Sequence, residues 1–303
     1  GAKVVICSKN CNYKNKNIVV IRSKNTRYFL SELASKFYKL KPKNLIAVTG
    51  TNGKTSVADL YFQILNLNKI PTASIGTLGI KYKKKTDKSD LTTPDTLYLH
   101  RSLQKIKKNN INNAIIETSS HGLHQKRLDH LNFKAGIFTN FSQDHLDYHK
   151  TMAKYLDAKL HLFRNIIKKG QVIISDRTIK EFSLLKSISK KKKLKLIDSS
   201  KVAEKLKKNT NLNFNEFQLK NLSMAIVAAK LNGLSENKIF RSLNKIKNVN
   251  GRLELIRTFS NKVKVYVDFA HTPDALEKAL KSLQSYYGRD ITLVFGCGGD
   301  RDF

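Results

Sequence analysis

The chain has 303 residues, enough for two domains and part of a third, and 40% hydrophobic residues can form a buried core. Its formal net charge of +34 suggests a polyanionic partner, such as nucleic acid, a membrane surface or a phosphorylated substrate. The charge is carried mostly by scattered Lys residues, without the Arg stripe and interleaved aromatics that single-strand binding favours. We therefore interpret it as a compositional bias, and expect neither nucleic acid nor a membrane as partner.

Residues 1–42 contain too few apolar positions for a core of their own. Val4–Cys7 and Ile18–Ile21 are typical of short strands, and the pattern of Thr26–Tyr38 predicts a helix. We expect this stretch to be the end of an α/β domain, with a boundary at Pro42. The sequence starts without Met and without a signal-peptide layout, so we expect it to begin inside a longer gene product.

Between residues 43 and 250, apolar strands alternate with helices, which predicts a mostly parallel sheet covered on both faces. The expected strands are Leu45–Val48, Asn113–Glu117, Ala135–Thr139 and Val172–Ser175. The expected helices are Lys54–Leu67, one starting at Thr93-Pro94-Asp95 with Thr93 as cap, one from the cap Thr151 to Ile167, Glu216–Leu231 and Glu236–Lys245. Residues 177–210 are Lys-rich and poorly patterned.

A second boundary near Asn250-Gly251 precedes a new α/β unit over residues 251–303. Its expected elements are the strand Val263–Asp268, the helix Pro273–Ser285 and the strand Ile291–Gly296. The fold class is therefore α/β.

The three cysteines form no metal-ligand pair and no even disulfide framework, so we expect a reducing, cytoplasmic setting. Cys7 and Cys11 have a CxxxC spacing, but no second Cys/His pair follows them.

Residues 45–55 combine a strand, a Gly-containing turn and a helix start, the arrangement in which backbone N–H groups cradle phosphates. Lys54 would neutralise phosphate charge and the Thr55 hydroxyl would bind Mg²⁺. Val48 stands where the strict phosphate-loop pattern has its first Gly, so a tight turn without a ligand is the alternative interpretation.

Acidic residues follow two of the expected strands. Glu117 ends one strand, where a carboxylate could hold Mg²⁺ beside a nucleotide, or simply cap a helix. Asp144, His145, Asp147 and His149 follow the next strand, with a spacing that could also belong to a zinc site or a polar loop.

Seven motifs in order resemble the Mur ligase family over nearly the whole chain. They are Val48–Thr55, Thr92–Asp95, Glu117–Leu123, Asp144–His149, Gly251–Glu254, Val267–Leu276 and Phe295–Asp302. The resemblance implies a central phosphate-loop-type ATP-binding domain over residues 43–250. It also implies the remainder of an N-terminal UDP-binding domain at 1–42 and the start of a Rossmann-like, amino-acid-binding C-terminal domain at 251–303.

The family forms amide bonds through an acyl phosphate made from ATP. The motif set is most similar to the member that adds the third amino acid to UDP-N-acetylmuramoyl-L-alanyl-D-glutamate in peptidoglycan biosynthesis. The resemblance therefore implies ATP and two Mg²⁺ sites as cofactors, and the UDP-muramoyl dipeptide and an amino acid as substrates. We expect a monomer that takes meso-diaminopimelate rather than L-lysine.

The resemblance also assigns site residues. ATP would be bound by Gly50, Thr51, Asn52, Gly53, Lys54, Thr55, Ser56, Asn221, Arg252 and Asp268. The metal ligands would be Thr55, Glu117, His145 and a carbamylated Lys159, and the catalytic residues Lys54, Lys159, His145 and Arg252. The dipeptide substrate would be held by Thr92, Thr93, Ser119, Gln125 and Arg127.

This chain departs from the family pattern at three positions: Gln218 replaces a second adenine-site Asn, Phe269 a Tyr and Phe303 a Lys. Folylpolyglutamate synthase, which shares the phosphate loop and the chemistry, is one alternative. A basic nucleic-acid-binding protein and a non-catalytic remnant are two others.

Overall fold

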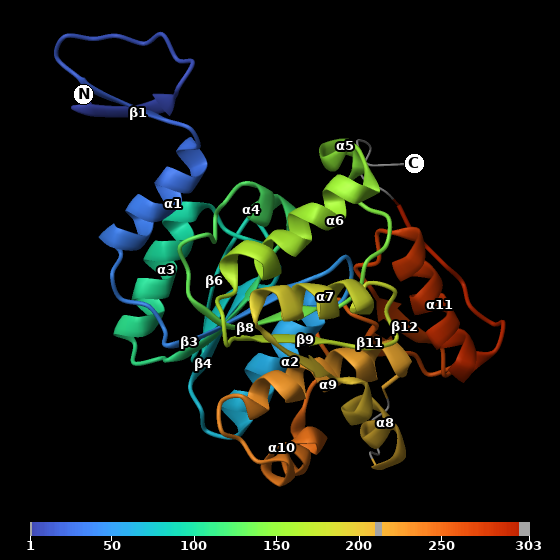
Figure 1. Cartoon of the computed structure of the whole chain (residues 1–303). Helices are drawn as coiled ribbons and strands as arrows, with labels where there is room; N and C mark the ends of the chain where they lie inside the picture. Colours follow the sequence, from blue (N-terminus) through green and yellow to red (C-terminus); the bar gives the residue numbers. More distant parts are fainter. Residues whose placement is uncertain (1, 210–213, 297–303) are drawn as a thin grey trace.

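The computed structural model describes residues 2–209 and 214–296, and its main element is an eight-stranded sheet surrounded by helices (Figure 1). A parallel pair of strands precedes this sheet in the chain and an antiparallel pair follows it. The strands are β1 (Val4–Ser8), β2 (Val19–Ser23), β3 (Asn44–Thr49), β4 (Thr72–Gly76), β5 (Gly79–Tyr82), β6 (Lys85–Asp87), β7 (Asn113–Glu117), β8 (Phe133–Phe138), β9 (Val172–Ser175), β10 (Lys195–Asp198), β11 (Glu254–Thr258) and β12 (Lys264–Val267).

Along the chain, most of the helices come between strands of the large sheet. They are α1 (Thr26–Phe37), α2 (Lys54–Leu67), α3 (Thr96–Lys108), α4 (Ser120–His124), α5 (Leu146–His149), α6 (Met152–His161), α7 (Phe182–Lys192), α8 (Ser200–Asn209), α9 (Glu216–Lys230), α10 (Glu236–Ser242) and α11 (Pro273–Tyr287). A π-helical turn, Leu162–Ile166, continues α6, and a 3₁₀ turn, Leu243–Lys245, continues α10.

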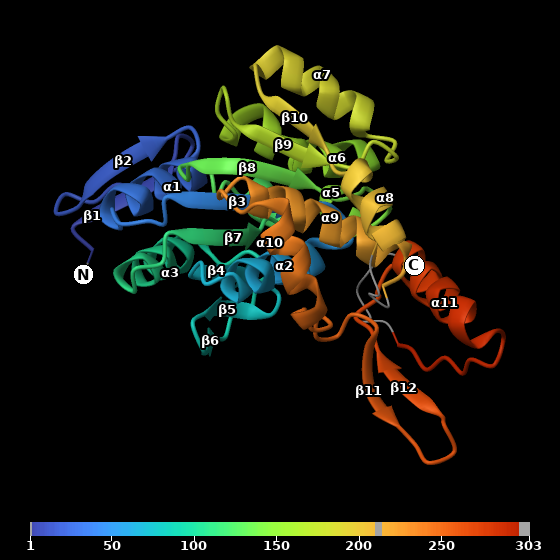
Figure 2. The ribbon, with the colours of Figure 1, turned by 90° about the horizontal axis from the view of Figure 1, so that it is seen from below.

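The large sheet has the order β10-β9-β8-β3-β7-β4-β5-β6, which can be followed in Figure 2. The pairs from β10 to β4 are parallel, and β5 and β6 add an antiparallel edge. This confirms the expected α/β fold with a mostly parallel sheet. Because β7 and β8 flank β3 in parallel, the carboxyl ends of all three strands meet at one edge, where ligands bind in such sheets.

The alternation of side chains along β3 divides the core into two clusters, one on each face of the sheet. Leu45 and Ala47 belong to the first cluster, which α3, α4, α6, the π turn and α7 cover. Ile46 and Val48 belong to the second, covered by α2, α8, α9 and α10. Both faces are thus apolar, as expected for parallel strands buried on both sides.

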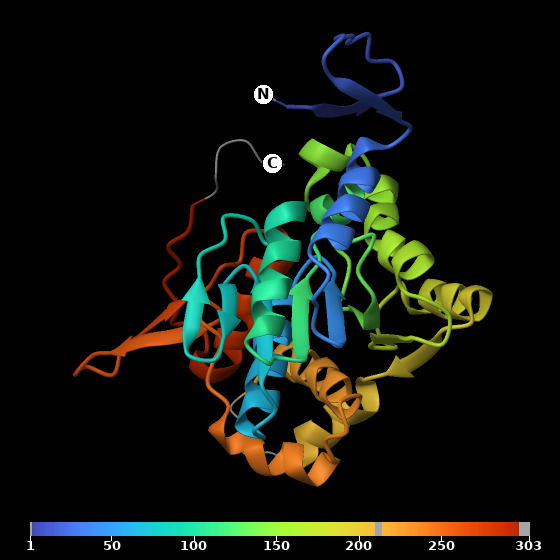
Figure 3. The same cartoon turned by 90° about the vertical axis from the view of Figure 1, so that its left-hand side faces the viewer.

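The segments before and after the large sheet extend from its body. β1 and β2 stand apart and connect to it through α1, which packs on α3 (Figure 3). β11 and β12 form a hairpin that projects away beside α11 (Figure 2). In the described part of the chain, none of the helices is both long and apolar enough to cross a membrane.

One expectation about a helix cap is wrong. The residue that caps α3 is Asp95, whose carboxylate accepts hydrogen bonds from the N–H groups of Leu97 and Tyr98. Thr93 instead donates its hydroxyl to the Glu117 carbonyl over 2.8 Å, so it ties this loop to β7. The cap at Thr151 is confirmed, although the helix that it starts ends in the π turn.

Of the Lys-rich residues 177–210, the described residues 177–209 are structured, contrary to the weak pattern of their sequence. They form α7, β10 and α8, with Leu185 and Ile188 buried along one side of α7. Only a narrow apolar stripe is needed here because the long Lys stems can cover apolar surface while their ammonium groups reach water. The many lysines therefore obscure the helical period of the apolar residues in this part of the sequence.

The expected strand Ile291–Gly296 does not form. No strand of the described residues pairs with it, and Val294 is 92% exposed. An extended segment needs a hydrogen-bonded neighbour to become a strand, and none lies beside it.

A buried ion pair fixes the antiparallel edge of the sheet to α2. Asp59 on α2 is 5% exposed, and its carboxylate lies 2.5 Å from the Lys81 ammonium on β5. Gln63 donates to the same carboxylate over 2.7 Å. This pair connects the hairpin to the helix that carries the phosphate-loop motif.

We expect Asp59→Ala to lower the free energy of unfolding by about 1–3 kcal/mol, because Lys81 and Gln63 would lose a charged hydrogen-bond acceptor. Urea unfolding measures this change. Asp157→Ala is the matched control: Asp157 pairs with Arg164 but is 71% exposed, so its loss should cost less than about 1 kcal/mol. Equal effects of the two substitutions would contradict the importance of the buried pair.

Candidate functional site

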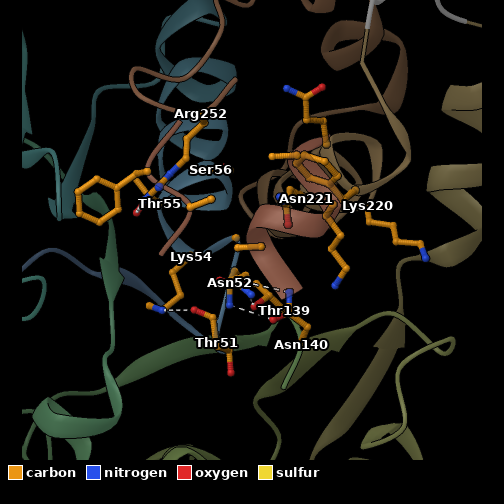
Figure 4. A pocket seen from close by; sticks show the side chains of 18 of the residues that line it. Thr51, Asn52, Lys54, Thr55, Ser56, Thr139, Asn140, Lys220, Asn221 and Arg252 are labelled. Atoms are coloured by element: carbon orange, nitrogen blue, oxygen red, sulfur yellow. Dashed lines mark hydrogen bonds between the residues drawn. The ribbon is translucent and has the colours of Figure 1, made fainter. Parts of the chain in front are cut away.

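A cleft of about 780 Å³ opens at the carboxyl ends of β3 and β8 and is closed on the other side by α9, α11 and the segment before β11 (Figure 4). It gathers many of the residues that the motifs selected. These are Thr51, Asn52, Gly53, Lys54, Thr55, Ser56, Thr92, Ser119, His145, Lys159, Asn221, Arg252 and Asp268. Thr93, Glu117, Gln125 and Arg127 lie behind this lining.

Two glycines allow the turn after β3 to pack against its neighbours. Gly50 and Gly53 have φ angles of +144° and +83°, which side chains rarely adopt. A Cβ at Gly50 would lie 1.9 Å from Thr139 Oγ1, and one at Gly53 would lie 2.5 Å from Asn221 Oδ1. The turn leads directly into α2, whose first residues have no side-chain cap, and a helix N-terminus of this kind favours an anion.

Two buried ammonium groups converge on one carbonyl oxygen of this turn. Lys54 donates to Gly50 O over 3.0 Å and to Thr51 O over 2.7 Å, and Lys159 on α6 donates to Gly50 O over 2.8 Å. Lys159 is 1% exposed and lies above the Tyr155 ring. Burial lowers the pKa of both lysines, that of Lys159 well below its usual range. The structure thus brings Lys159, distant in sequence, to the phosphate loop.

A carboxylate and a hydroxyl meet beside the start of α2. Glu117 is 1% exposed, and its Oε2 accepts a hydrogen bond from Thr55 Oγ1 over 2.8 Å. Thr77 donates its N–H and its hydroxyl to the same carboxylate, and Arg252 donates to Thr55 Oγ1 over 3.1 Å. Burial raises the pKa of Glu117, although Lys54 and these hydrogen bonds oppose the effect. A cation at this carboxylate would offset its desolvation.

The acid–imidazole segment after β8 forms one wall of the cleft. Asp144 Oδ2 lies 3.3 Å from His145 Nε2 and 3.8 Å from His271 Nε2. Burial alone would raise the pKa of Asp144, but His271, His145 and Lys54 lower it overall. In the described residues no three His, Cys, Asp or Glu side chains are grouped as a metal would require.

His145 and His149 belong to an aromatic cluster with His121 and Tyr155. The ring of His145 lies 4.8 Å from that of His121, and the ring of His149 lies 5.2 Å from that of Tyr155. Burial lowers the pKa of His145 and of His149 to about 4. Both imidazoles are therefore neutral near neutral pH, the form in which histidine can donate a lone pair.

Asn221 and Gln218, one turn apart on α9, both line the cleft but have different hydrogen-bond partners. The Asn221 amide lies against Gly53, inside the cleft. Gln218 accepts a hydrogen bond from the N–H of Asn215 and so completes a capping box at the start of α9. The Gln that replaces the family's second Asn is thus engaged in a local structural role.

The segment before β11 brings Arg252 to the cleft, and Asp268 enters it directly after β12. The Arg252 guanidinium lies over the Phe269 ring, 4.9 Å from its centroid. Asp268 accepts hydrogen bonds from the N–H groups of Leu253 and Ala270, both over 2.7 Å. Its carboxylate therefore holds the connection between the large sheet and the following hairpin in shape.

The residues expected to hold the dipeptide substrate form a connected chain of contacts. The hydroxyl oxygens of Thr93 and Ser119 lie 3.0 Å apart, and Arg127 donates to Thr93 O and to Gln125 Oε1. Thr92 contacts the hydroxyl of Thr77, which in turn binds the carboxylate of the buried Glu. Thr92 and Ser119 face the cleft, whereas Gln125 and Arg127 are half-buried behind it.

The sequence did not single out several residues that complete the site. Asn140 binds the phosphate loop through its side chain and its carbonyl, and Tyr155 contacts Thr51 over 3.2 Å. Asp274 at the start of α11 accepts a hydrogen bond from Asn52 over 3.0 Å. Two features of the sequence could have identified them. Asn140 comes just after β8, and Tyr155 lies one helical turn before Lys159. The described residues end at 296. Most of the Phe295–Asp302 motif, and Phe303, therefore lie outside them.

Comparisons with known proteins agree on one family. Residues 48–249 match the Mur ligase middle domain, and residues 251–303 match the Mur ligase, glutamate ligase domain. Two similar relatives are named UDP-N-acetylmuramoyl-L-alanyl-D-glutamate--2,6-diaminopimelate ligase. The protein from Brucella melitensis biotype 1 is 35% identical and that from Rickettsia bellii 38%, each over the whole chain. The chain spans 66% and 68% of these relatives, about two thirds of their length.

Solved structures give a consistent result. A structure of a UDP-N-acetylmuramoyl-L-alanyl-D-glutamate--2,6-diaminopimelate ligase superposes with a TM-score of 0.72 and 26% identity, covering 96% of this chain and 64% of that one. A Mycobacterium tuberculosis folylpolyglutamate synthase complexed with ADP and AMPPCP superposes with a TM-score of 0.66 over 86% of this chain and 70% of that one. Its identity of 17% means that the fold alone is shared.

We expect the buried histidines to make the fold acid-sensitive. The pKa of His145 and of His149 is lowered to about 4, so the unfolded chain takes up protons near pH 6.5 that the folded chain does not. Their contribution to stability is complete above about pH 6.5 and is lost as the pH falls towards about 4, by roughly 1–2 kcal/mol per histidine at about pH 5.

Urea unfolding at several pH values measures this loss, and NMR follows the two imidazoles directly. Their ring protons should not shift between about pH 8 and about pH 5.5 in the folded chain. A midpoint near that of free histidine for either ring would contradict the prediction.

Proposed function

Because this chain belongs to the Mur ligase family, we propose that it contributes the ATP-binding and carboxylate-activating part of an amide ligase. The reaction would join the third amino acid to UDP-N-acetylmuramoyl-L-alanyl-D-glutamate through an acyl phosphate, in peptidoglycan biosynthesis. The observation that carries this proposal is the convergence of Lys54, Lys159, Glu117 and Arg252 on one phosphate loop. Several basic side chains beside one carboxylate suit a step in which three phosphates and a substrate carboxylate approach one another.

In this proposal Gly50 to Ser56 bind the phosphates of ATP. The tight fit of Gly50 and Gly53 keeps the backbone close to the ligand, and the N-terminus of α2 adds its partial positive charge. Lys54 neutralises phosphate charge and Arg252 adds a second cation from the opposite wall. Asn221 contributes its amide to the base, and Asp268, held in place by two N–H groups, lies near the ribose.

Thr55 and Glu117 have the right chemistry for one Mg²⁺ site. A hydroxyl and a buried carboxylate 2.8 Å apart are hard oxygen ligands, and the carboxylate is desolvated without a directly bound cation. His145, neutral at neutral pH, and Lys159 would hold a second metal ion. Bound Mg²⁺ supplies charge stabilisation for phosphoryl transfer.

Lys159 fits this role only as a carbamate. Its burial favours the neutral amine, which is the form that adds CO₂ to become a carboxylate with loss of a proton. The carbamate would turn this buried neutral amine into an anion able to ligate Mg²⁺. Gly50 O and the Tyr155 ring already fix the end of the side chain in position.

Thr92 and Ser119, with Thr93, Gln125 and Arg127 behind them, are proposed to hold the UDP-muramoyl dipeptide. Their network reaches Glu117 through Thr77 and through the Thr93 hydroxyl, which joins the substrate wall to the proposed metal site. An arginine and an amide suit carboxylates and the peptide of such a substrate. The acceptor carboxylate would thus be oriented towards the phosphates.

The domain boundaries follow from this proposal. Residues 1–42 would close the UDP-binding domain, 43–250 form the ATP-binding domain, and 251–303 begin the amino-acid-binding domain. We further propose that the protein acts as a monomer in the cytoplasm and binds small molecules rather than nucleic acid. A role in cell shape and division follows for any enzyme of wall synthesis.

The substrate test compares acceptors and amino acids in the protein that carries this chain at its natural length. We expect ADP release to require the UDP-muramoyl dipeptide and to be absent with folate. The kcat/KM for meso-diaminopimelate should exceed that for L-lysine by about tenfold or more. A pocket for meso-diaminopimelate should hold a cation for its second carboxylate, and bound L-lysine would leave this cation without a partner. Turnover with folate instead would favour the folylpolyglutamate alternative. Salt-sensitive duplex binding without ATP turnover would favour a nucleic-acid-binding protein.

A second prediction concerns the carbamate. Lys159→Ala should lose ligase activity by about 100-fold or more and recover part of it with added formate or acetate, since a small carboxylate can occupy the vacated space. Lys54→Ala is the matched control, because it removes a cation from the same carbonyl of Gly50 and should not respond to either anion. Full activity of Lys159→Arg would contradict the carbamate, because a guanidinium cannot form it.

A further inference from the structure

The CxxxC pair of the N-terminal segment lies far from the proposed ligase site and has its own chemistry. Cys7 lies in β1, and Cys11 follows the turn in which its N–H donates to Ser8 O over 3.1 Å. This turn folds the chain back so that Cys11 lies close enough to Cys7 for each thiol to affect the pKa of the other. Both side chains are free thiols and half-buried, so small solutes can reach them.

The two thiols are not equivalent. A hydrogen bond from the Tyr13 backbone and one from the Cys7 thiol lower the pKa of Cys11. Desolvation and the hydrogen bond to Cys11 raise the pKa of Cys7. Cys11 is therefore the nucleophile of the pair, and Cys7 is the thiol that holds its proton beside it.

Arg22 places a positive charge at this pair. It stands opposite Cys7 in the register of the parallel strands β1 and β2. Its guanidinium donates to the carbonyls of Cys11 and Tyr13, both over 3.4 Å. The charge lowers the pKa of both thiols. A partly exposed thiol with a nearby cation and a second thiol in contact is the environment of redox-sensing cysteines.

We propose that Cys7 and Cys11 form a peroxide-sensitive dithiol that is reversibly oxidised to an intramolecular disulfide. The Cys11 thiolate attacks one oxygen of a hydroperoxide and becomes a sulfenic acid, with loss of water or alcohol. The Cys7 sulfur then attacks the Cys11 sulfur, its proton leaves with the hydroxyl group as water, and the S–S bond forms. The hydroperoxide takes up the two electrons that the thiols lose.

Oxidation would lock the turn that starts the long connection between β1 and β2. Arg22 already clamps this connection from the β2 side, so the disulfide would add a covalent closure to a segment that stands apart from the main sheet (Figure 1). The nucleotide cleft contains no residue of this segment, so the site does not depend on the proposed ligase activity.

The chain provides a direct readout because Lys9 lies between the two cysteines. The protein is treated with hydrogen peroxide, its remaining thiols are blocked with an alkylating agent, and it is digested with trypsin. We expect the peptides Val4–Lys9 and Asn10–Lys14 to appear joined by a disulfide, and to separate after reduction. In Cys7→Ser, Cys11 should instead be trapped as a sulfenic acid by dimedone.

Two arginine variants test the electrostatic part. Arg22→Gln should slow peroxide-dependent loss of the Cys11 thiol at least about threefold, because the thiolate loses its cation. Arg27→Gln, which removes a charge from the same segment away from the thiols, should leave the rate unchanged. Two results would overturn the proposal. One is alkylation of both cysteines after peroxide has oxidised the half-buried Met152; the other is disulfides that form only between chains.

Discussion

The carbonyl oxygen of Gly50 accepts hydrogen bonds from two lysines that lie on different helices, and much of the site depends on this convergence. Burying two ammonium groups so close together is costly unless anions compensate them. Glu117 and Asp144 supply part of that compensation, but Arg252 adds a further cation. Three basic side chains, those of Lys54, Lys159 and Arg252, therefore surround the phosphate loop, an arrangement that suits a polyanion better than a neutral molecule.

The parallel sheet is what allows this convergence. β3 ends in the phosphate loop, β7 ends at Glu117, and β8 leads to the loop before α6. Because the three strands run in the same direction side by side, their following loops must share one edge. The helices on both faces bury the strands, so the polar groups at this edge are held by a rigid scaffold. Burial of the apolar core offsets the unfavourable free energy of placing like charges close together at the site.

The segment after the large sheet completes the cleft through a small number of polar contacts. Arg252 reaches Thr55, Asp274 reaches Asn52, and His271 faces Asp144. Each of these contacts joins a residue of the last part of the chain to a residue at the phosphate loop or the adjacent wall. Their partners are the groups that would meet the nucleotide, so ligand binding and the position of this segment are physically coupled. Hydrogen bonds in which one partner is charged are strong enough for this. They bury little apolar surface, which leaves the arrangement adjustable.

The sequence by itself determined the order of most elements, the parallel sheet and the phosphate loop, because apolar periodicity and glycine placement are local properties. It also pointed to Glu117 and His145 from their positions after expected strands, but to Lys159 and Arg252 only by resemblance to a family. It failed where the decisive contact was not local. The Lys-rich residues 177–209 form helices and a strand because a sheet edge is available to them. Ile291–Gly296 remains unpaired for want of a neighbouring strand among the described residues.

Tertiary structure alone decided what the selected side chains touch. Thr93 looked like a helix cap and instead binds the end of β7, and Gln218 closes a capping box. Nothing in the local sequence indicates that Lys159 lies under the phosphate loop rather than in solvent, because lysine is common throughout the chain. Sequence period fixes which face of an element is apolar, but the partner of a buried charge is fixed only when distant strands are brought together.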